Sequence, residues 1–490
     1  MNTFKRKSLY AALAGVGALG VTGAAQAVNV NPDGLGQALI YPYYTTQGTG
    51  TLGSVAPYNS LLSVVNSTNS GKVVKVRFLE GKFSHEVLDF NLWLSPKDVW
   101  TAAIVPLGAG AGIVTADLSC TTPTVSRNAA APTPFVNVLL VAPDPAGAGL
   151  DRTKEGYVEI IEMGNLTGGT LTAITHVQPS PPGRPPAENA AGDCPTLPVG
   201  ATAPTDLVPG NGGLFGGISL INPLAGGDAS EDAVALASFS ATTLWAPAGS
   251  IQPDLSQVNP KLSVVFNNTE VVTTDWSASS NTADAVSAIL MHDNIFNEFV
   301  LDAGTASGTD WVVTFPTKHF YYNAQYNVTK LFESNFRATG ACDDVGITIW
   351  NREEQTVQQQ TTFSPPPPQG VDSLCWEANV ITFNNTNVLL SANNRNIATG
   401  FPNGWVTLNF FPGPSTIIPP VHQLIGGATI RQNTGTGALT QQVAATYNGL
   451  PVVGFAAQSF NNGTLVGTSG GFILAHYVGT FIHKYTRLIQ

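Results

Sequence analysis

The side chains that could carry acid–base chemistry gather in two stretches of this chain. One stretch holds a histidine with two carboxylates and the other holds three glutamates, at His85, Glu86, Asp89, Glu155, Glu159 and Glu162. Two carboxylates can hydrolyse a glycosidic bond when they are held about 5 Å or about 6.5–9.5 Å apart. Strand alternation from Glu86 onward would place Glu86 and Asp89 on opposite faces, so a joint site needs a bulge or a turn at His85. Without one, these residues are solvated polar positions beside strands, which is the interpretation that the spacing favours.

Calcium is the one metal for which the chain offers candidate ligands. Carboxylates occur in two acidic groups, at Asp228, Asp232, Asp343 and Asp344. Oxygen ligands suit Ca²⁺, although no calcium loop of the EF-hand type is present. The seven histidines are scattered and none forms an H-E-x-x-H motif, which argues against a dedicated zinc site. We therefore expect no cofactor, with Ca²⁺ as the single ion that these residues could hold.

Aromatic side chains offer a second kind of candidate site, because exposed rings can stack on sugar rings. Four candidates for such a ligand-binding platform are Tyr43, Tyr44, Trp93 and Trp100. Large aromatic side chains contribute strongly to hydrophobic cores. The competing interpretation is therefore that these four side chains are buried.

The amino terminus predicts export. A basic segment at Lys5–Lys7 precedes an apolar run, Leu9–Val21, and Ala25-Gln26-Ala27 supplies a small-residue cleavage site. The apolar run is shorter than the roughly 18 residues that favour a membrane span. We expect residues 1–27 to be a signal peptide for the general export pathway, with no transmembrane span in the mature chain. The expected location is extracellular or at the cell surface, with the periplasm as the alternative.

The charge balance excludes one class of partner. The chain has 21 basic and 32 acidic residues and a formal net charge of −11, which becomes more negative if the basic leader is removed. Nucleic acid binds clustered Lys and Arg, so it is not an expected partner. Charged residues make up only 11% of the chain, against about 25% in ordinary soluble proteins. Such a surface relies on hydroxyls and amides and suits lateral packing against copies of itself or other envelope components.

The four cysteines predict two disulfides. Cys120, Cys194, Cys342 and Cys375 all follow the expected leader, and no two form a C-x-x-C pair. In an exported chain this pattern favours disulfides over a metal site. Cys120–Cys194 and Cys342–Cys375 are the expected pairs, because each would close one irregular, Pro-rich excursion. The two cross-paired connectivities remain open.

Hydrophobic periodicity predicts a mainly β fold. In 72–79, Val74, Val76 and Phe78 alternate with Lys75 and Arg77, and 87–94 and 99–105 follow as further strands. We expect antiparallel β-sandwiches with long Pro/Gly-rich loops, and we expect the charges on these strands to face water or a neighbouring subunit. The expected domains are an N-terminal sandwich at 28–215 and a helix-containing β-rich domain at 216–490.

Two inserted α-helices are expected in the second domain. Ser230-Glu231-Asp232 resembles the acidic first turn of a helix that would run to about Phe239. A longer helix is expected from Thr282 to about Leu301, because Val286, Ile289 and Leu290 and then Phe296, Phe299 and Val300 recur at helical spacing.

Four segments resemble a group of largely uncharacterised secreted or cell-surface proteins of Gram-negative bacteria. They are KVRFLEG with EVLDFNLWLSPKDVWTA, EFVLDAGTASGTDWVVTFPTK, LCWEANVITF and GLPVVGFAAQSF. The resemblance implies a surface location and transfers no catalytic residues. The acidic, Thr/Asn/Gly-rich composition is also similar to that of surface-layer proteins.

Three functions follow as hypotheses. The first is an exported cell-surface or envelope structural protein that self-associates like a surface layer and is not an enzyme. The second is an extracellular module that binds polysaccharide or another ligand and acts in adhesion. The third is a secreted hydrolase with a carboxylate pair around Glu86 or Glu159.

Overall fold

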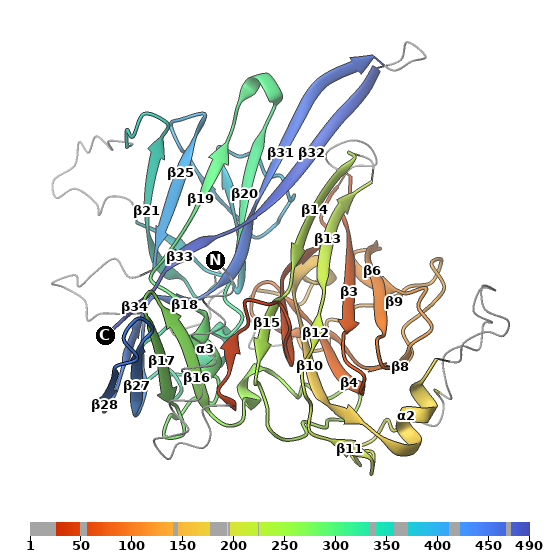
Figure 1. Cartoon of the computed structure of the whole chain (residues 1–490). Helices are drawn as coiled ribbons and strands as arrows, with labels where there is room; N and C mark the ends of the chain where they lie inside the picture. The colour runs from red at the N-terminus through yellow and green to blue at the C-terminus, as the bar shows by residue number, and fades with distance from the viewer. Residues whose placement is uncertain are drawn as a thin grey trace.

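The computed structural model describes residues 26–49, 56–140, 146–176, 194, 197–223, 225–332, 340–356, 371–410, 422–466 and 472–490. The expected signal peptide at 1–27 therefore lies outside the described residues, apart from its last two positions. The fold is mainly β and its sheets are largely antiparallel, as expected (Figure 1). The described residues contain two α-helices, α2 (Gly168–Ile174) and α3 (Asp284–Leu290).

Two sheets form the N-terminal sandwich. The first has eight strands, in the order β1 (Asn29–Val30), β15 (Val234–Ala237), β2 (Ala38–Thr45), β10 (Glu155–Leu166), β4 (Gly71–Glu80), β5 (Glu86–Leu94) and β8 (Cys120–Thr122), with β11 (Leu207–Val208) paired to β10. The second has seven, in the order β14 (Gly227–Asp232), β13 (Gly217–Asn222), β3 (Asn59–Asn66), β6 (Val99–Leu107), β7 (Gly110–Val114) and β9 (Thr133–Pro134), with β12 (Leu214–Phe215) paired to β3. Val76 and Phe78 of the first sheet pack with Val64 and Trp100 of the second.

Two five-stranded sheets form the C-terminal sandwich. One has the order β22 (Val371–Leu374), β21 (Asp343–Asn351), β25 (Asn403–Asn409), β19 (Asn294–Val300) and β33 (Lys484–Thr486). The other has the order β24 (Asn394–Ile397), β23 (Ala378–Phe383), β20 (Gly308–Thr314), β31 (Val453–Val466) and β32 (Phe472–Ile482). Phe299 of the first stacks on Phe383 of the second with ring centroids 5.6 Å apart, so the two sheets meet face to face.

Three smaller sheets complete the β structure. They are β16 (Leu262–Asn267) with β17 (Glu270–Asp275), β27 (Thr429–Asn433) and β28 (Leu439–Gln442); β18 (Met291–His292) with β30 (Leu450–Pro451); and β26 (Gln423–Ile425) with β29 (Thr446–Asn448) and β34 (Leu488–Ile489). Short 3₁₀ turns also occur, at η3 (Leu150–Lys154), η5 (Leu255–Gln257), η6 (Ala303–Thr305) and η7 (Lys318–Tyr321).

The two sandwiches share one sheet as a common layer. Strands β20 and β23 are buried along their whole length. Trp311 and Ile381 point into the C-terminal core, whereas Val312 and Val380 point into the core of the N-terminal sandwich. Thr314 Oγ1 donates to the carbonyl of Pro42 in β2, over a distance of 2.7 Å. The halves of the chain are therefore joined by a continuous packed interior.

The three consecutive strands expected in the N-terminal half exist, as β4, β5 and β6. β4 and β5 are antiparallel neighbours. β6 pairs with β3 in the opposite sheet, so the chain crosses the sandwich between β5 and β6. The N-terminal sheets also extend past the expected limit at residue 215, because β13, β14 and β15 pair within them.

Both helix predictions needed correction. The segment expected as a helix from Ser230 forms the end of β14 and then β15, where pairing with β13 and β2 overrides the local acidic cap signal. The longer expected helix, 282–301, is helical only at α3. The chain then continues as β18 and β19, and β19 forms a seven-residue ladder with β25. Ile295 and Phe299 also fit a strand with one buried face, and sheet pairing decides between the two periods.

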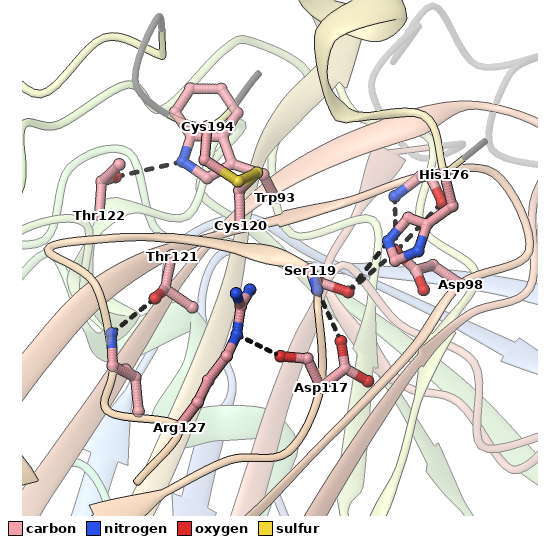
Figure 2. The surroundings of a disulfide bond; sticks show 12 residues. Trp93, Asp98, Asp117, Ser119, Cys120, Thr121, Thr122, Arg127, His176 and Cys194 are labelled. Atoms are coloured by element: carbon pink, nitrogen blue, oxygen red, sulfur yellow. Dashed lines mark hydrogen bonds and ion pairs between the residues drawn. A yellow bond between two sulfur atoms is a disulfide. The ribbon is translucent and has the colours of Figure 1, made fainter. Parts of the chain in front are cut away.

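The two expected disulfides are confirmed. Cys120 is bonded to Cys194, and Cys342 is bonded to Cys375. Figure 2 shows the first bond beside the indole of Trp93, whose Nε1 donates to Thr122 Oγ1 at 3.1 Å. Among the described residues, no helix has the length and apolar character needed to cross a membrane.

Removing the Cys120–Cys194 bond is expected to lower the free energy of unfolding by about 4 kcal/mol, because the bond closes a 74-residue separation and restricts the unfolded chain. Urea unfolding of Cys120→Ala/Cys194→Ala measures the loss. The matched variant Cys342→Ala/Cys375→Ala removes a bond between residues 33 positions apart, and it should lower the free energy of unfolding slightly less. An unfolding free energy that is unchanged by the first pair would contradict this account.

Candidate functional site

A cleft of about 550 Å³ lies over the outer face of the eight-stranded sheet, and we call it the carboxylate cleft. Its floor includes Arg77 of β4 and Glu86 of β5, and Asp254 and His319 also line it. Its rim includes aromatic and apolar side chains from later parts of the chain, at Leu139, Ile251, Phe320, Tyr322 and Tyr326. The volume is within the usual range for small-molecule sites, about 300–1,000 Å³.

A β-bulge brings the floor together. Phe78 of β4 is opposite Leu88 of β5, but the next residue, Leu79, is opposite Glu86, so Val87 is an extra residue in β5. A bulge of this kind shifts the alternation of side chains by one. Glu86 consequently lies on the same face as Asp89. From the sequence, a joint site of Glu86 and Asp89 needed a bulge or a turn at His85. The structure has a bulge close by, at Val87.

Arg77 holds two carboxylates, Glu86 at the floor and Glu159, which is fully buried and does not itself line the cleft. Arg77 Nε donates to Glu86 Oε2 at 2.8 Å, and Arg77 Nη1 donates to Glu159 Oε2 of β10 at 2.6 Å. Arg77 and Glu159 are direct cross-strand partners, so the sheet register fixes this contact. All three side chains are buried. Burial of a charged pair is unfavourable unless the partners satisfy one another, which this geometry does in large part.

Burial shifts the pKa values of both carboxylates bound by Arg77 upward. Burial raises the pKa of Glu86 to about 7, although Arg77 lowers it in part. Burial likewise raises the pKa of Glu159, and Arg77 offsets part of that shift. Glu159 Oε1 has no hydrogen-bond partner among the described residues. The cleft thus contains an acid that can be protonated near neutral pH beside a fixed guanidinium.

A second polar group lies behind His319. The Nδ1 atom of His319 is 3.7 Å from Glu377 Oε2, and burial raises the pKa of Glu377. Nearby, the hydroxyl of Tyr157 donates to Ser84 Oγ at 2.7 Å. His319 is positioned by the 3₁₀ turn η7, which follows β20 directly. The shared sheet therefore fixes the place of the histidine relative to Glu159.

The rim presents aromatic side chains to solvent. Tyr322 is 56% exposed and Tyr326 is 41% exposed. Asn281 Nδ2 donates to the carbonyls of Phe320 and Tyr326, at 3.1 Å and 3.2 Å, which holds the rim segment against the start of α3. The cleft therefore combines a hydrogen-bonding floor with exposed ring faces at its edge.

The structure separates the other carboxylates from this cleft. Asp89 pairs with Lys75 at 2.6 Å, and Glu162 pairs with Lys72 at 2.5 Å. Glu155 accepts from the hydroxyl of Tyr43 at 2.6 Å. Of the carboxylates considered from the sequence, the structure brings Glu86 and Glu159 together. Their link is Arg77. The strand pattern predicted that Arg77 and Lys75 face water or a neighbouring subunit, but both are buried because later segments of the same chain cover this face.

The aromatic platform expected from the sequence does not form. Tyr43, Tyr44, Trp93 and Trp100 are all buried, and their side chains pack within the cores of the N-terminal half. Trp93 packs against Trp245 with ring centroids 5.9 Å apart. Tyr322 and Tyr326 are the exposed aromatics of the cleft, and the aromatic run from His319 to Tyr322 was the sequence signal that could have pointed to them.

The four candidate calcium ligands do not converge. Asp343 is buried and pairs with Lys318 at 2.6 Å, whereas Asp344 lies on the other face of β21 and accepts from Ser373 Oγ. Asp228 and Asp232 are exposed on β14, in a different sheet. Within the described ranges, no group of three or more His, Cys, Asp or Glu is placed to hold a metal ion.

A serine, a histidine and an aspartate also meet near the first disulfide. Ser119 Oγ lies 3.4 Å from His176 Nε2 and 3.3 Å from Asp98 Oδ2, and His176 Nε2 lies 3.5 Å from the same Asp98 oxygen (Figure 2). A catalytic triad needs the aspartate on the ring nitrogen remote from the serine. Here both contacts use Nε2, so the group is a polar cluster without triad geometry.

Comparisons with known proteins identify no relative. No family model matches the chain, and neither a curated protein nor a solved structure matches it. The geometry of the carboxylate cleft is therefore the basis for its interpretation.

Replacing Glu86 by Gln is expected to remove a pH-dependent loss of stability. The pKa of Glu86 is raised to about 7 in the folded protein, against about 4.3 in an unfolded chain. Between these values the unfolded state has released a proton that the folded state keeps. The unfolding free energy of the wild type therefore falls as pH rises from about 4.5 to about 7, by up to about 3 kcal/mol from this group.

Urea unfolding across this pH range measures the effect, and the stability advantage of the wild type over Glu86→Gln should shrink as pH rises. The exposed Glu353→Gln variant controls for the loss of one carboxylate from the net charge. Parallel stability profiles for the wild type and Glu86→Gln would show that Glu86 titrates alike in both states.

Proposed function

We propose that this protein is an exported cell-surface protein that binds a neutral saccharide in the carboxylate cleft. The observation that carries the proposal is the combination of the Arg77–Glu86 floor, with Arg77 held from within by Glu159, and the exposed rings of Tyr322 and Tyr326. Two disulfides support an oxidising compartment. The resemblance to secreted and cell-surface proteins of Gram-negative bacteria is consistent with this location.

The cleft chemistry suits a ligand that has both hydroxyls and apolar ring faces. The buried carboxylate of Glu86 and the guanidinium of Arg77 supply an acceptor and donors in fixed positions, as in small-molecule sites that orient a ligand through a few polar groups. Arg77 neutralises part of the floor, so a neutral ligand avoids the repulsion that an acidic polysaccharide would meet at Asp254. Tyr322 and Tyr326 provide flat, amphipathic surfaces at the edge.

The same residues bear on the hydrolase hypothesis. Glycoside hydrolysis needs one carboxylic acid and one carboxylate on either side of the scissile bond. Here the guanidinium of Arg77 contacts both Glu86 and Glu159, so it occupies the space between their facing oxygens. This arrangement favours binding over cleavage. Cleavage of a bound oligosaccharide that is lost in Glu86→Gln would instead support the hydrolase.

Replacing Tyr322 by Ala is expected to weaken saccharide binding about threefold to tenfold, because one exposed stacking ring is removed. A glycan array followed by calorimetric titration of the best neutral oligosaccharide measures this change. Tyr477→Ala is the matched control, since Tyr477 is equally exposed at 56% but lies on β32. The proposal fails if no neutral glycan binds, or if Tyr322→Ala binds as tightly as the wild type.

A second candidate function is structural, through self-association at β32. This strand is the last in its sheet, and its eleven residues include no Asp, Glu, Lys or Arg. Three of its large side chains are exposed, at Tyr477, Phe481 and Ile482. Figure 1 shows the β31–β32 hairpin extending past β14, which contacts β32 through Thr480 and Ser230. Edge strands without charge are prone to pair with another chain, and the occupant proposed here is β32 of a second copy.

Charges placed on β32 are expected to abolish this association. Tyr477→Lys/Phe481→Lys should be monomeric at concentrations where the wild type forms dimers or larger species, because a charged edge opposes strand pairing. Sedimentation velocity over a concentration series measures the difference. Val443→Lys controls for the added charge, since Val443 is 92% exposed and lies outside β32. A wild type that stays monomeric throughout would exclude this function.

A further inference from the structure

A separate cavity of about 280 Å³ lies where the N-terminal segment, α3 and the C-terminal strands meet. Its walls are mostly apolar and include Val234, Ile289, Leu290, Ile295, Val452 and Ile482. Its polar lining includes one residue of β18 and three from the C-terminal segment 483–487, at His292, His483, Tyr485 and Arg487. None of these residues lines the carboxylate cleft, so the cavity is an independent site.

Arg487 carries a guanidinium with unused donors inside this cavity. Its Nη2 donates to the carbonyl of Ile289, near the end of α3, at 2.9 Å. Its Nε and Nη1 are shielded from solvent and have no hydrogen-bond partner among the described residues. The guanidinium carbon lies 5.1 Å from the ring centre of Tyr485. Burial lowers the pKa of Arg487, and the groups that oppose this shift are tyrosines, with no carboxylate among them.

His292 lines the same cavity, and its ring nitrogens also lack hydrogen-bond partners among the described residues. The residue is only 7% exposed. Its ring packs on Tyr485 with centroids 4.0 Å apart. Burial lowers the pKa of His292 well below its usual range, and Arg487 and His483 lower it further.

This pattern differs from the treatment of buried cations elsewhere in the described chain. The five buried lysines and arginines have carboxylate partners within 3 Å, whereas Arg487 is half-buried and two of its guanidinium nitrogens are shielded without such a partner; the five are Lys72, Lys75, Arg77, Arg152 and Lys318. A charge whose nitrogens are shielded from water and unpaired destabilises a fold, so an anion bound at Arg487 would stabilise it. Glu231 and Asp232 line the cavity as well, but neither is among the groups that shift the pKa of Arg487 or His292.

We propose that this cavity binds a small monocarboxylic acid with an apolar chain. The carboxylate accepts from the free Nε and Nη1 of Arg487 and from a ring N–H of His292, and the chain lies along the apolar wall. Guanidinium groups recognise carboxylates through charge-assisted hydrogen bonds. The mostly apolar lining and the small volume exclude a polymer and favour a short, unbranched acid.

Hexanoate is the probe, and hexan-1-ol is its neutral counterpart with the same chain length. Calorimetric titration of the purified protein should give a saturable isotherm with hexanoate and a Kd at least about tenfold weaker with hexan-1-ol, because the alcohol lacks the charge. Hexanoate should also raise the thermal midpoint in a saturable manner, since a ligand of the folded state stabilises it. No hexanoate binding, or equal binding of both compounds, overturns the proposal.

The residue test uses Arg487→Met, which keeps an unbranched apolar side chain. We expect hexanoate affinity to fall at least about tenfold. The unliganded variant should unfold at the same or a higher temperature, because the unpaired, shielded charge is gone. This second readout separates a lost site from a lost fold. Lys484→Met, an exposed cation on β33, is the control and should bind hexanoate as the wild type does. Unchanged affinity in Arg487→Met would overturn the proposal.

Discussion

The burial of one sheet on both of its faces is the constraint on which the rest of the structure depends. Strands β20 and β23 supply alternate residues to two different cores, with Trp311 and Ile381 on one side and Val312 and Val380 on the other. Neither core is complete without this layer, because apolar surface left in water costs about 25 cal/mol per Å². The layer also leads directly into η7, so the position of His319 over the eight-stranded sheet follows from the packing of β20.

The burial of charged side chains as ion pairs is the second feature that organises the fold. The chain has few charged residues, and several of them form buried pairs on the outer face of the eight-stranded sheet, as in Lys75 with Asp89 and Arg77 with Glu159. Later segments cover that face, since Lys75 Nζ also donates to the carbonyl of Pro247. The low charged fraction therefore leaves still fewer charges for the surface. Arg487 differs from these pairs within the described residues, because the neighbours of its shielded guanidinium nitrogens are tyrosines and a carbonyl.

Local sequence pattern predicted the strands β4, β5 and β6, the mainly β class and both disulfides. It failed where distant segments decide the outcome. Period-2 alternation predicted that Arg77 faces water or a neighbouring subunit, because alternation cannot reveal which later segment covers a sheet face. Helical spacing from Phe296 to Val300 was overridden by the ladder with β25, which lies more than a hundred residues away in the chain. The bulge at Val87 depends on how β5 pairs with β4, so the site at Glu86 could be stated from the sequence only as a condition.

The shared middle layer has a consequence for the order of folding. Tyr58 donates to the carbonyl of Val388, and Ser391 donates to Glu155, across separations of 330 and 236 residues. Part of the packing around the first strands is therefore completed only after most of the chain has been made. Such non-local contacts slow folding. Because Val312 of β20 and Val380 of β23 lie in the core of the N-terminal sandwich, that core is complete only after both strands have been made.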